Sequence, residues 1–339
     1  MGAMGHAAVT PERVMQFVWG YAAPLMMQAA VQNRVFDLLD QGPKTVEEVA
    51  AASGASVRGL RAVMNGLTGL QLLTRDAEGR YGLAADSAAF LVSGKPGYLG
   101  GILRHMSAQI IPDWLRLSEV VASGKPVEAV NRQGTGAEFF HEFVEGIFPM
   151  SYPAARKLAE DLGIASVNKP TKVLDLAAGS GVWGVALAER SPKVRVTAVD
   201  WPGVLDVTRR IAERHGMAER FEYVAGDLLE ADFGRGYHIA TLGHILHSEG
   251  EKRGRALLKR TFDAMAPGGT VAIAEFLVDE GRTSPPLGLL FAVNMLVLTD
   301  AGDTFSFPEI AGWLREAGFR DARTLDSPGP SPLILATRP

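Results

Sequence analysis

The segment VLDLAAGSGVWG, residues 173–184, constrains the fold more than any other feature of the sequence. A short apolar run ends at Asp175, and a turn of small residues leads into an apolar stretch with helical spacing. This order is typical of an open parallel sheet, which binds ligands at the carboxyl ends of its strands. Gly179, Gly181 and Gly184 also satisfy the G-x-G-x-x-G pattern of dinucleotide sites, although that match alone has little specificity.

Strand and helix patterns alternate from Lys172 onward, in a chain of 339 residues that is long enough for two domains. The expected strands are KVLDLA, RVTAVD, FEYVAGD, HIATLG and TVAIAEF, and the helical segments between them are VWGVALAER, VLDVTRRIAERHG and GRALLKRTFDAM. This alternation predicts a doubly wound α/β fold, in which a parallel sheet is covered by helices on both faces. Because the earlier pattern is different, we expect a domain boundary near residues 165–170.

The residues before this boundary predict helices. The first helical segment is PERVMQFVWGYAAPLMMQAAVQNRVFDLLD, residues 11–40, and its apolar side chains recur on more than one face. A helix with a solvated side needs only one apolar face. We therefore expect this segment to pack on a further surface, such as that of a second subunit.

Two helices and a hairpin are expected next. Thr45 can cap a helix together with Glu48, and Gly54 ends that helix before a second one begins. Leu72–Thr74 and Tyr81–Leu83 then flank a turn at residues 76–79. Helix, turn, helix and hairpin in this order predict a winged-helix fold.

Charge argues against DNA binding by this region. A protein that binds duplex DNA normally carries a clear basic excess where it meets the phosphates. Here the basic residues between positions 41 and 90 are offset one for one: Lys44, Arg58, Arg61, Arg75 and Arg80 against Glu47, Glu48, Asp76, Glu78 and Asp86. Since the whole chain has a net charge of −4, we expect no nucleic-acid partner, although a winged-helix regulator that senses a ligand remains the alternative of another class.

Composition excludes several other classes. The absence of cysteine excludes disulfides, thiolate zinc sites and a cysteine nucleophile, and it agrees with a cytoplasmic location. The N-terminal residues show no signal-peptide pattern. No apolar run reaches the roughly 18 to 20 residues of a membrane-spanning helix, so we expect no membrane partner. LGLLFAVNMLVL, near residue 290, is the longest candidate and predicts a buried helix.

Acidic residues follow three of the expected strands. Asp175 precedes the glycine turn, Asp200 ends the second strand, and Gly226-Asp227 ends the third. Asp175 would lie awkwardly beside a pyrophosphate but suits a cation or an amine. With a Pro267-Gly268-Gly269 turn before the fifth strand, these positions favour a nucleoside with a sulfonium tail over a dinucleotide. A nicotinamide oxidoreductase remains an alternative.

Together these motifs resemble the S-adenosylmethionine-dependent small-molecule O-methyltransferases with an N-terminal winged-helix dimerisation domain, which include plant caffeate-type and bacterial secondary-metabolite enzymes. The resemblance covers almost the whole chain. It implies a mainly α dimerisation domain in residues 1–95, a helical linker in residues 96–168 that contributes to the acceptor pocket, and a Rossmann-like class I methyltransferase domain in residues 169–339. It also implies a homodimer that converts S-adenosyl-L-methionine into S-adenosyl-L-homocysteine while methylating a hydroxyl group of an aromatic or polyketide-like molecule.

The resemblance also implies a set of cofactor-binding residues. Asp175 to Gly181 matches the family's glycine loop around the methionine and ribose, with Ala177 in place of the first glycine. Asp200 matches an acid that accepts hydrogen bonds from the ribose hydroxyls, a role that suits a bidentate carboxylate. The alternative is that Asp200 and Asp227 only cap helices. The complete set is Asp175, Ala177, Gly179, Gly181, Asp200, Trp201, Gly226, Asp227 near the adenine, and Leu228.

Catalysis is assigned to the densest histidine cluster of the chain. Ile245-Leu246-His247 matches the family segment whose histidine deprotonates the acceptor hydroxyl, and histidine is the default general base near neutral pH. His244 is the second choice, and His238 is expected at the surface or in packing. Glu275, at the end of the fifth strand, matches a carboxylate that orients the histidine.

Two departures leave the reaction open. The family commonly has His-Asp-Trp where this chain has His247-Ser248-Glu249. Its second flanking acid falls at Thr304, so either the adjacent Asp303 replaces it as a third catalytic residue or that acid is absent. A carbon or nitrogen methyltransferase, or a relative that does not transfer methyl, is therefore the alternative within the same fold.

The acceptor pocket is expected between the helices around residues 100–150 and 285–300. Apolar and soft side chains suit a flat aromatic acceptor, and Asn294 could orient its hydroxyl or carbonyl group. The candidates are Met106, Trp114, Phe148, Met150, His244, Phe291, Asn294 and Met295, with Phe143 and Leu298 as further ones. No metal is expected, because the only acidic positions that could cluster are already assigned to the cofactor.

Overall fold

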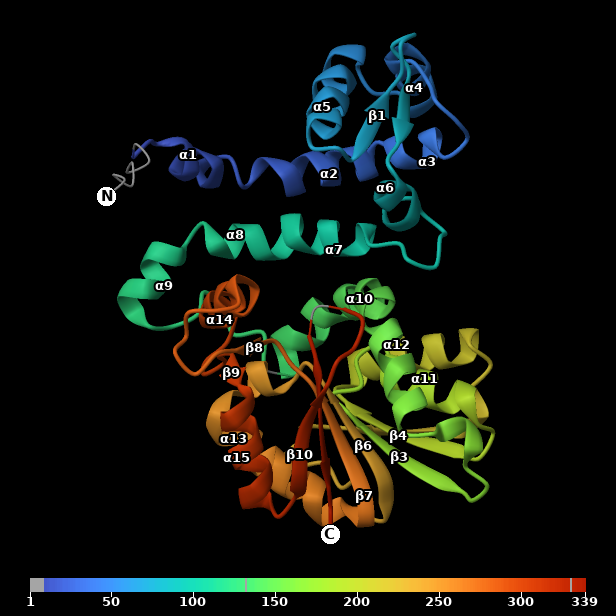
Figure 1. Ribbon diagram of the computed structural model, residues 1–339, viewed down its shortest axis with the longest axis vertical. Helices are drawn as coiled ribbons and strands as arrows, with labels where there is room; N and C mark the ends of the chain where they lie inside the picture. Colours follow the sequence, from blue (N-terminus) through green and yellow to red (C-terminus); the bar gives the residue numbers. More distant parts are fainter. Residues whose placement is uncertain (1–8, 132, 330) are drawn as a thin grey trace, which may run out of the picture. The chain divides into compact units, whose positions relative to one another are not determined.

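The computed structural model describes residues 9–131, 133–329 and 331–339, and the chain divides into two compact units, Met1–Ser107 and Ala108–Pro339. The elements of both units are labelled in Figure 1. The first unit contains α1 (Glu12–Val18), α2 (Ala22–Gln32), α3 (Val35–Leu39), α4 (Val46–Ser53), α5 (Val57–Gly69), β1 (Leu73–Arg75), β2 (Tyr81–Leu83), α6 (Ala85–Phe90) and α7 (Gly100–His105).

The winged-helix pattern predicted for the first unit is confirmed. Thr45 and Glu48 form a reciprocal capping box at the start of α4, and Gly54 ends the helix in a left-handed conformation that glycine adopts without strain. β1 and β2 pair as an antiparallel hairpin. Phe36, Met64 and Tyr81 are fully buried in the core of this unit, which holds the helices against the hairpin.

Helix α1 remains uncovered within the chain. It buries none of its residues, and Phe17 and the adjacent Trp19 are 74% and 62% exposed. Exposed aromatic side chains so close together are unusual on a surface that faces only water. The observation agrees with the expectation that this segment packs on a further surface.

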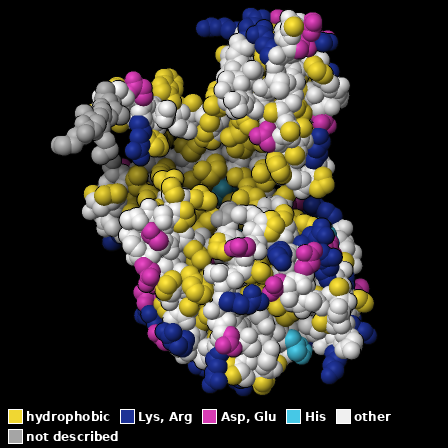
Figure 2. All heavy atoms as spheres, viewed as in Figure 1, with side chains coloured by type: hydrophobic (Ala, Val, Ile, Leu, Met, Phe, Trp, Pro, Cys, Tyr) yellow, Lys and Arg dark blue, Asp and Glu magenta, His cyan; other side chains and the backbone are white. Residues whose placement is uncertain are grey.

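Several basic side chains of the first unit are paired with acids. Arg61 lies 2.8 Å from Glu47, and Arg80 lies 2.9 Å from Asp76. Figure 2 shows Lys and Arg side chains interspersed with Asp and Glu on the face that it displays. This distribution differs from the basic surface that a DNA-binding winged helix needs.

The second unit is built on one large sheet, and several helical segments precede the first strand of that sheet. Its elements are η1 (Met106–Ile110, whose first two residues belong to the first unit), α8 (Ile111–Trp114), α9 (Leu117–Ser123), α10 (Gln133–Asp161), η2 (Ile164–Ser166), β3 (Thr171–Leu176), α11 (Val182–Arg190), β4 (Val194–Asp200), α12 (Pro202–Arg214), η3 (Ala218–Arg220), β5 (Phe221–Ala225), β6 (Tyr237–Gly243), α13 (Leu246–Ala264), β7 (Met265–Ala274), β8 (Leu277–Val278), α14 (Pro286–Leu298), β9 (Phe305–Ser306), α15 (Phe307–Ala317), β10 (Arg320–Leu325) and β11 (Leu333–Thr337).

The seven strands of the large sheet follow the order β10-β11-β7-β6-β3-β4-β5. Strands β3 to β7 are parallel, as predicted, whereas β11 pairs antiparallel with β7 and β10 antiparallel with β11. β3 pairs with β4 on one side and with β6 on the other, so the strand order reverses at β3. Ligands of doubly wound sheets bind at the carboxyl ends of the strands beside such a reversal.

Helices cover both faces of this sheet (Figure 1). On one face Val144 of α10, Val185 of α11 and Val204 of α12 belong to one apolar cluster with the strands. On the other face α13 and α15 pack through a second cluster that includes Leu258 and Trp313. Most of β3, β4, β6 and β7 is therefore buried between helices, and the carboxyl ends of the strands are the expected place for a ligand.

One sequence prediction needs correction at α14. The stretch expected as a buried helix does form a helix, but Leu287 and Leu290 in its first half are exposed, while Met295 and Leu298 are buried. This helix carries apolar side chains on all of its faces, and the rest of the chain buries only some of those side chains. Within the described residues, no helix combines the length and the apolar character that crossing a membrane requires.

Candidate active site

Five strand ends supply the side chains of the candidate site. β3 leads into the glycine turn, β4 ends at Asp200, β5 is followed by Gly226 and Asp227, β6 leads to His244 and His247, and β7 is followed by Glu275. Because parallel strands end at the same edge of a sheet, this topology gathers residues that are far apart in the sequence. Every predicted cofactor residue and the predicted histidine–glutamate pair thus belong to one edge.

The glycine turn between β3 and α11 is held from below by Asp175. Its carboxylate accepts hydrogen bonds from the N–H of Gly184 at 3.1 Å and from the Thr241 hydroxyl at 2.7 Å. Asp175 has no exposed surface, and burial raises its pKa to about 7. The structure therefore places Asp175 beneath the turn as a support, rather than in the direct contact with a cation or amine that the sequence suggested.

The turn itself needs its glycines. Gly181 has φ +72°, and a Cβ at this position would lie 2.8 Å from a methyl carbon of Thr208. Ala177 takes the place of the family's first glycine at φ +52°, so a residue with a side chain occupies the left-handed region here. A Cβ at Gly184 would meet Val196 at 2.7 Å, which shows how closely α11 approaches the sheet.

Asp200 joins the turn to the end of β4. Its carboxylate accepts hydrogen bonds from the N–H of Gly179 at 2.9 Å and from the N–H of Trp201 at 2.7 Å. Burial raises the pKa of Asp200 to about 6, although both N–H donors favour the ionised form. A carboxylate has about four acceptor positions, so two remain for a vicinal diol. The Trp201 ring beside it lies 6.1 Å from that of Phe140.

Asp227 follows β5 and faces an arginine. The N–H of Gly226 donates to the Asp200 carbonyl at 3.0 Å, which joins the ends of β4 and β5. The Asp227 carboxylate accepts the N–H of Leu229 at 2.8 Å and binds Arg253 through both oxygens. Leu228, in contrast, is buried in the apolar core.

His247 and Glu275 form the central pair of the site. His247 Nδ1 lies 2.8 Å from Glu275 Oε2, and the backbone N–H of His247 donates to Glu275 Oε1 at 3.3 Å. Both side chains are buried. Burial opposes ionisation of Glu275, but the neighbouring His247 holds the pKa of this carboxyl below its usual range. Within the described part of the chain, Nε2 of His247 has no hydrogen-bond partner.

Aromatic rings enclose this pair. The Phe291 ring meets the His247 ring edge-on at 4.8 Å between centroids, and Phe276 lies 4.3 Å from Phe291 and 5.1 Å from His244. His244 Nε2 is 2.8 Å from the Ser331 hydroxyl, and burial lowers the pKa of His244 to about 4. His244 is thus neutral near pH 7 and engaged with Ser331, which makes His247 the better placed of the two as a base.

Asp303 approaches His247 through its backbone. Its N–H donates to the His247 carbonyl at 2.9 Å. Its carboxylate instead accepts the N–H of Thr304 at 2.7 Å and lies 3.8 Å from Arg282. Among the described contacts of this carboxylate none involves the His247 ring, so the structure does not supply Asp303 as a second acid on the imidazole. The segment after α14 instead directs this carboxylate toward the N–H of Thr304 and the Arg282 side chain.

The predicted acceptor residues do not all lie in one place. Phe291, Asn294 and Met295 lie on α14, and the Trp114 indole of α8 donates to the Asn294 side-chain oxygen at 2.9 Å. Phe148, in contrast, stacks on Tyr152 at 5.3 Å and lies against His215 at 5.2 Å, so it packs between α10 and α12. The remaining candidates are Met106, which belongs to the first unit, Met150 on α10 near the turn at Gly329, Phe143 in the α10 packing and buried Leu298.

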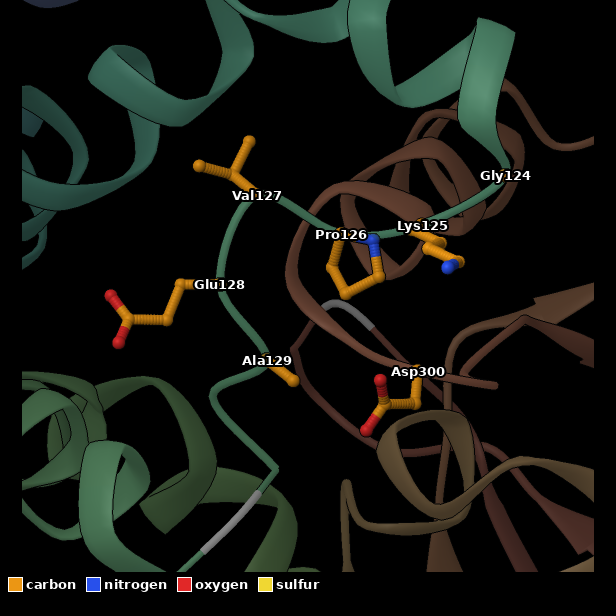
Figure 3. A pocket seen from close by; sticks show the side chains of 7 residues that line it. All are labelled: Gly124, Lys125, Pro126, Val127, Glu128, Ala129 and Asp300. Carbon is orange, nitrogen blue, oxygen red and sulfur yellow. The ribbon is translucent and has the colours of Figure 1, made fainter.

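A pocket of about 610 Å³ lies beside the end of α14 (Figure 3). Its lining residues are Gly124, Lys125, Pro126, Val127, Glu128, Ala129 and Asp300, none of which the sequence predicted. The N–H of Val127 donates to the Val297 carbonyl at 3.2 Å, and the Asn131 amide donates to the carbonyl of Ser248 at 3.3 Å. The segment that lines the pocket is therefore attached both to α14 and to the residue that follows His247.

Several residues of the site escaped sequence analysis. Phe276 directly follows Glu275, so the strand-end rule could have included it. Thr241, Ser331 and Arg253 reach the site from three different elements, and their sequence neighbourhoods carry no motif. The described residues include no group of three or more His, Asp or Glu side chains placed to hold a metal ion.

The fold is a doubly wound α/β sheet, and the site holds a buried histidine–glutamate pair at the carboxyl ends of its strands. The O-methyltransferase domain family matches residues 121–320, and the O-methyltransferase dimerisation domain matches residues 15–93. The chain therefore belongs to the O-methyltransferase family that carries a dimerisation domain. It is an S-adenosylmethionine-dependent methyltransferase.

Individual relatives span nearly the whole chain. The 3-hydroxy-5-methyl-1-naphthoate 3-O-methyltransferase of Streptomyces sahachiroi is 31% identical, over 92% of this chain and 91% of the relative. The tetracenomycin polyketide synthesis 8-O-methyl transferase TcmO of Streptomyces glaucescens is 28% identical, over 97% of both. The solved structure of PigF with SAH, a methyl transfer enzyme known from Serratia sp., is 25% identical with a TM-score of 0.82 and covers 97% of this chain and 100% of that one.

Proposed function

We propose that this enzyme transfers the methyl group of S-adenosylmethionine to a hydroxyl group of an aromatic or polyketide-like small molecule, with His247 as general base. The observation that carries the proposal is the 2.8 Å contact of His247 Nδ1 with Glu275 Oε2, in a buried site lined by Phe276 and Phe291. The most similar relatives described above methylate a naphthoate and act in tetracenomycin polyketide synthesis.

The residues at the glycine turn fit the cofactor. Gly179 and Gly181 carry no side chain at two positions of the turn, and the two remaining acceptor positions of Asp200 suit the ribose hydroxyls. Asp227, beyond β5, is the candidate partner of the adenine amino group, and Trp201 and Leu228 are candidates beside the nucleoside. When bound, S-adenosylmethionine supplies a methyl group that its sulfonium already activates.

The histidine–glutamate pair prepares the acceptor. When Nδ1–H of His247 donates to Glu275, Nε2 carries the free lone pair and can accept the hydroxyl proton. The ionised Glu275 then stabilises the imidazolium that forms and keeps the ring oriented. Phe276 and Phe291 exclude water and offer flat surfaces to an aromatic acceptor. Asn294, held by Trp114, is a candidate to orient that acceptor, and this contact supports a contribution of the helical segment 96–168 to its pocket.

We also propose a homodimer formed through the N-terminal unit and no nucleic-acid partner. The dimerisation domain match and the uncovered α1 support the first statement. The paired charges of the winged-helix region support the second.

Two measurements test the proposed function. Calorimetric titration with S-adenosylmethionine and with NADH should give micromolar binding of the first and none of the second, whereas binding of NADH alone would contradict the proposal. Turnover with a panel of hydroxylated naphthoates and polyketides should then fall roughly a hundredfold or more in His247→Ala, as loss of a general base requires, with cofactor affinity unchanged.

His238→Ala is the matched control, because His238 lies at the start of β6 and only accepts the N–H of Lys172, at 3.0 Å. It should retain normal turnover. Mass and NMR analysis of the product identifies the methylated atom. Methyl transfer to carbon or nitrogen would overturn the assigned hydroxyl chemistry. Unchanged turnover of His247→Ala would move the base to His244 or show that no base is needed.

A further inference from the structure

An ion network links Asp227 to the beginning of α13. Arg253 Nη2 lies 3.0 Å from Asp227 Oδ1 and 2.8 Å from Asp227 Oδ2. Arg253 Nε donates to Glu249 Oε2 at 2.6 Å, four residues earlier and across the non-helical backbone of Gly250, whose φ is +72°. A single guanidinium therefore joins two carboxylates, one on the loop after β5 and one two residues after His247.

Glu249 gives this arginine a fixed anchor. The Glu249 side chain is only 7% exposed, and burial raises its pKa even though Arg253 favours ionisation. Burying an ionised carboxylate without a cation costs free energy, so the contact with Glu249 holds the Arg253 guanidinium in place. Because the guanidinium is planar, fixing Nε on Glu249 also fixes the direction in which Nη2 approaches Asp227.

The contacts leave Asp227 one acceptor position. The Leu229 N–H and Arg253 occupy Oδ1, and Arg253 occupies one position on Oδ2, out of about four on an ionised carboxylate. The carboxylate is still about one-third exposed, so a ligand can reach the remaining position. Asp227 is thus prepared to accept one hydrogen bond in one direction.

We propose that Arg253, anchored by Glu249, is a positioning residue that makes Asp227 selective for a 6-amino purine in the cofactor. The proposal rests on the proposed function, because it assumes that Asp227 faces the nucleobase. A fixed carboxylate opposite the purine C6 accepts the N–H of adenine and repels the oxygen of hypoxanthine. A carboxylate released from Arg253 can shift to the N1–H of hypoxanthine, so the discrimination between the two bases falls.

The test compares S-adenosylhomocysteine with S-inosylhomocysteine by calorimetry in the full-length protein. Wild type should bind the adenine compound at least about tenfold more tightly, the size of one well-placed hydrogen bond to a charged group. Arg253→Lys keeps the charge but loses the planar fork, and Glu249→Gln removes the anchoring charge. Each should lower the ratio of the two affinities at least about threefold.

Arg255→Lys is the matched control, because Arg255 lies on the same helix and pairs with Glu251 at 2.8 Å without reaching Asp227. Its ratio should equal that of wild type. Weaker binding of both compounds at an unchanged ratio in the Arg253 and Glu249 variants would show a purely structural role and overturn the inference. Equal binding of both compounds by wild type would also overturn it. No binding of either compound by folded wild type would instead refute the proposed function itself.

Discussion

Asp200 is a residue whose protonation should be visible in cofactor binding. Its pKa is raised to about 6 by burial, and in the proposed site the ribose hydroxyls need the ionised carboxylate as an acceptor. Below pH 6 most Asp200 carboxyl groups are protonated, and they must lose this proton before the cofactor binds. We expect the Kd of S-adenosylhomocysteine to be nearly constant above pH 7 and to rise about tenfold between pH 7 and pH 5, as measured by calorimetry.

Asp200→Asn provides the control for this titration. The amide cannot ionise, so the variant should bind weakly with a Kd that changes little between pH 5 and pH 7. A wild-type Kd that is independent of pH over this interval would refute a role of the ionised Asp200 in holding the ribose.

Asp175 should act on stability rather than on binding. Its pKa rises from 3.8 to about 7 on folding because the carboxyl is buried. A carboxyl with a raised folded-state pKa contributes most below its unfolded pKa, and the contribution is lost as the pH rises through 7. Relative to Asp175→Asn, wild type should therefore lose on the order of 2–3 kcal/mol of unfolding free energy between pH 5 and pH 8. Urea titrations of both proteins at each pH measure this difference, and parallel pH profiles would disprove it.

At the scale of elements, two glycines allow the cost of left-handed backbone strain to be separated from the cost of a steric clash. Gly181 and Gly216 have nearly the same φ, +72° and +70°, but a Cβ at Gly181 meets Thr208 at 2.8 Å whereas one at Gly216 meets nothing within 4 Å. Gly216→Ala should cost about 1 kcal/mol from left-handed strain. Gly181→Ala should cost at least about 1 kcal/mol more and weaken cofactor binding. Equal losses in the two variants would show that Thr208 moves aside.

The sequence predicted the elements that carry strong local patterns. The alternation from Lys172 marks β3 to β7 and their helices because buried parallel strands are short apolar runs. β10 and β11 were not predicted. RDARTL of β10 is polar and lies at the edge of the sheet, where only one neighbour constrains it, and LILAT of β11 is apolar but follows the alternating strands and helices. The antiparallel arrangement of β10 and β11 is equally invisible, since pairing direction depends on a connection rather than on side-chain pattern.

The candidate site follows the same division. Strand-end residues such as Asp200, His247 and Glu275 could be placed from topology, because each lies at the end of a recognisable strand or shortly after it. The carboxylate of Asp303 could not, since its direction depends on how the segment after α14 meets His247 and Arg282. Arg253 was also beyond prediction, because its pairing with Asp227 joins residues 26 positions apart without a motif.

At the scale of the whole molecule, the second unit holds the candidate active site, and the first unit matches a dimerisation domain. The second unit contains the cofactor turn and the histidine–glutamate pair, and its own helices cover both faces of its sheet. The first unit matches the dimerisation domain and leaves a helix uncovered. An apolar surface of this kind in the first unit is stable in water when a second subunit covers it.

Substitutions in α1 should therefore change the assembly without unfolding the chain. α1 buries none of its residues within the chain, and Trp19 stacks on the nearby Tyr21 at 6.1 Å, so Phe17→Glu combined with Trp19→Glu should act mainly on the proposed contacts with a second subunit. Light scattering after size exclusion should give about twice the chain mass of 36.2 kDa for wild type and the chain mass for the variant, with unchanged circular dichroism. Leu115→Glu, at a position 83% exposed in the second unit, is the control and should remain dimeric. A monomeric wild type, or a variant that stays dimeric, would exclude α1 from the interface.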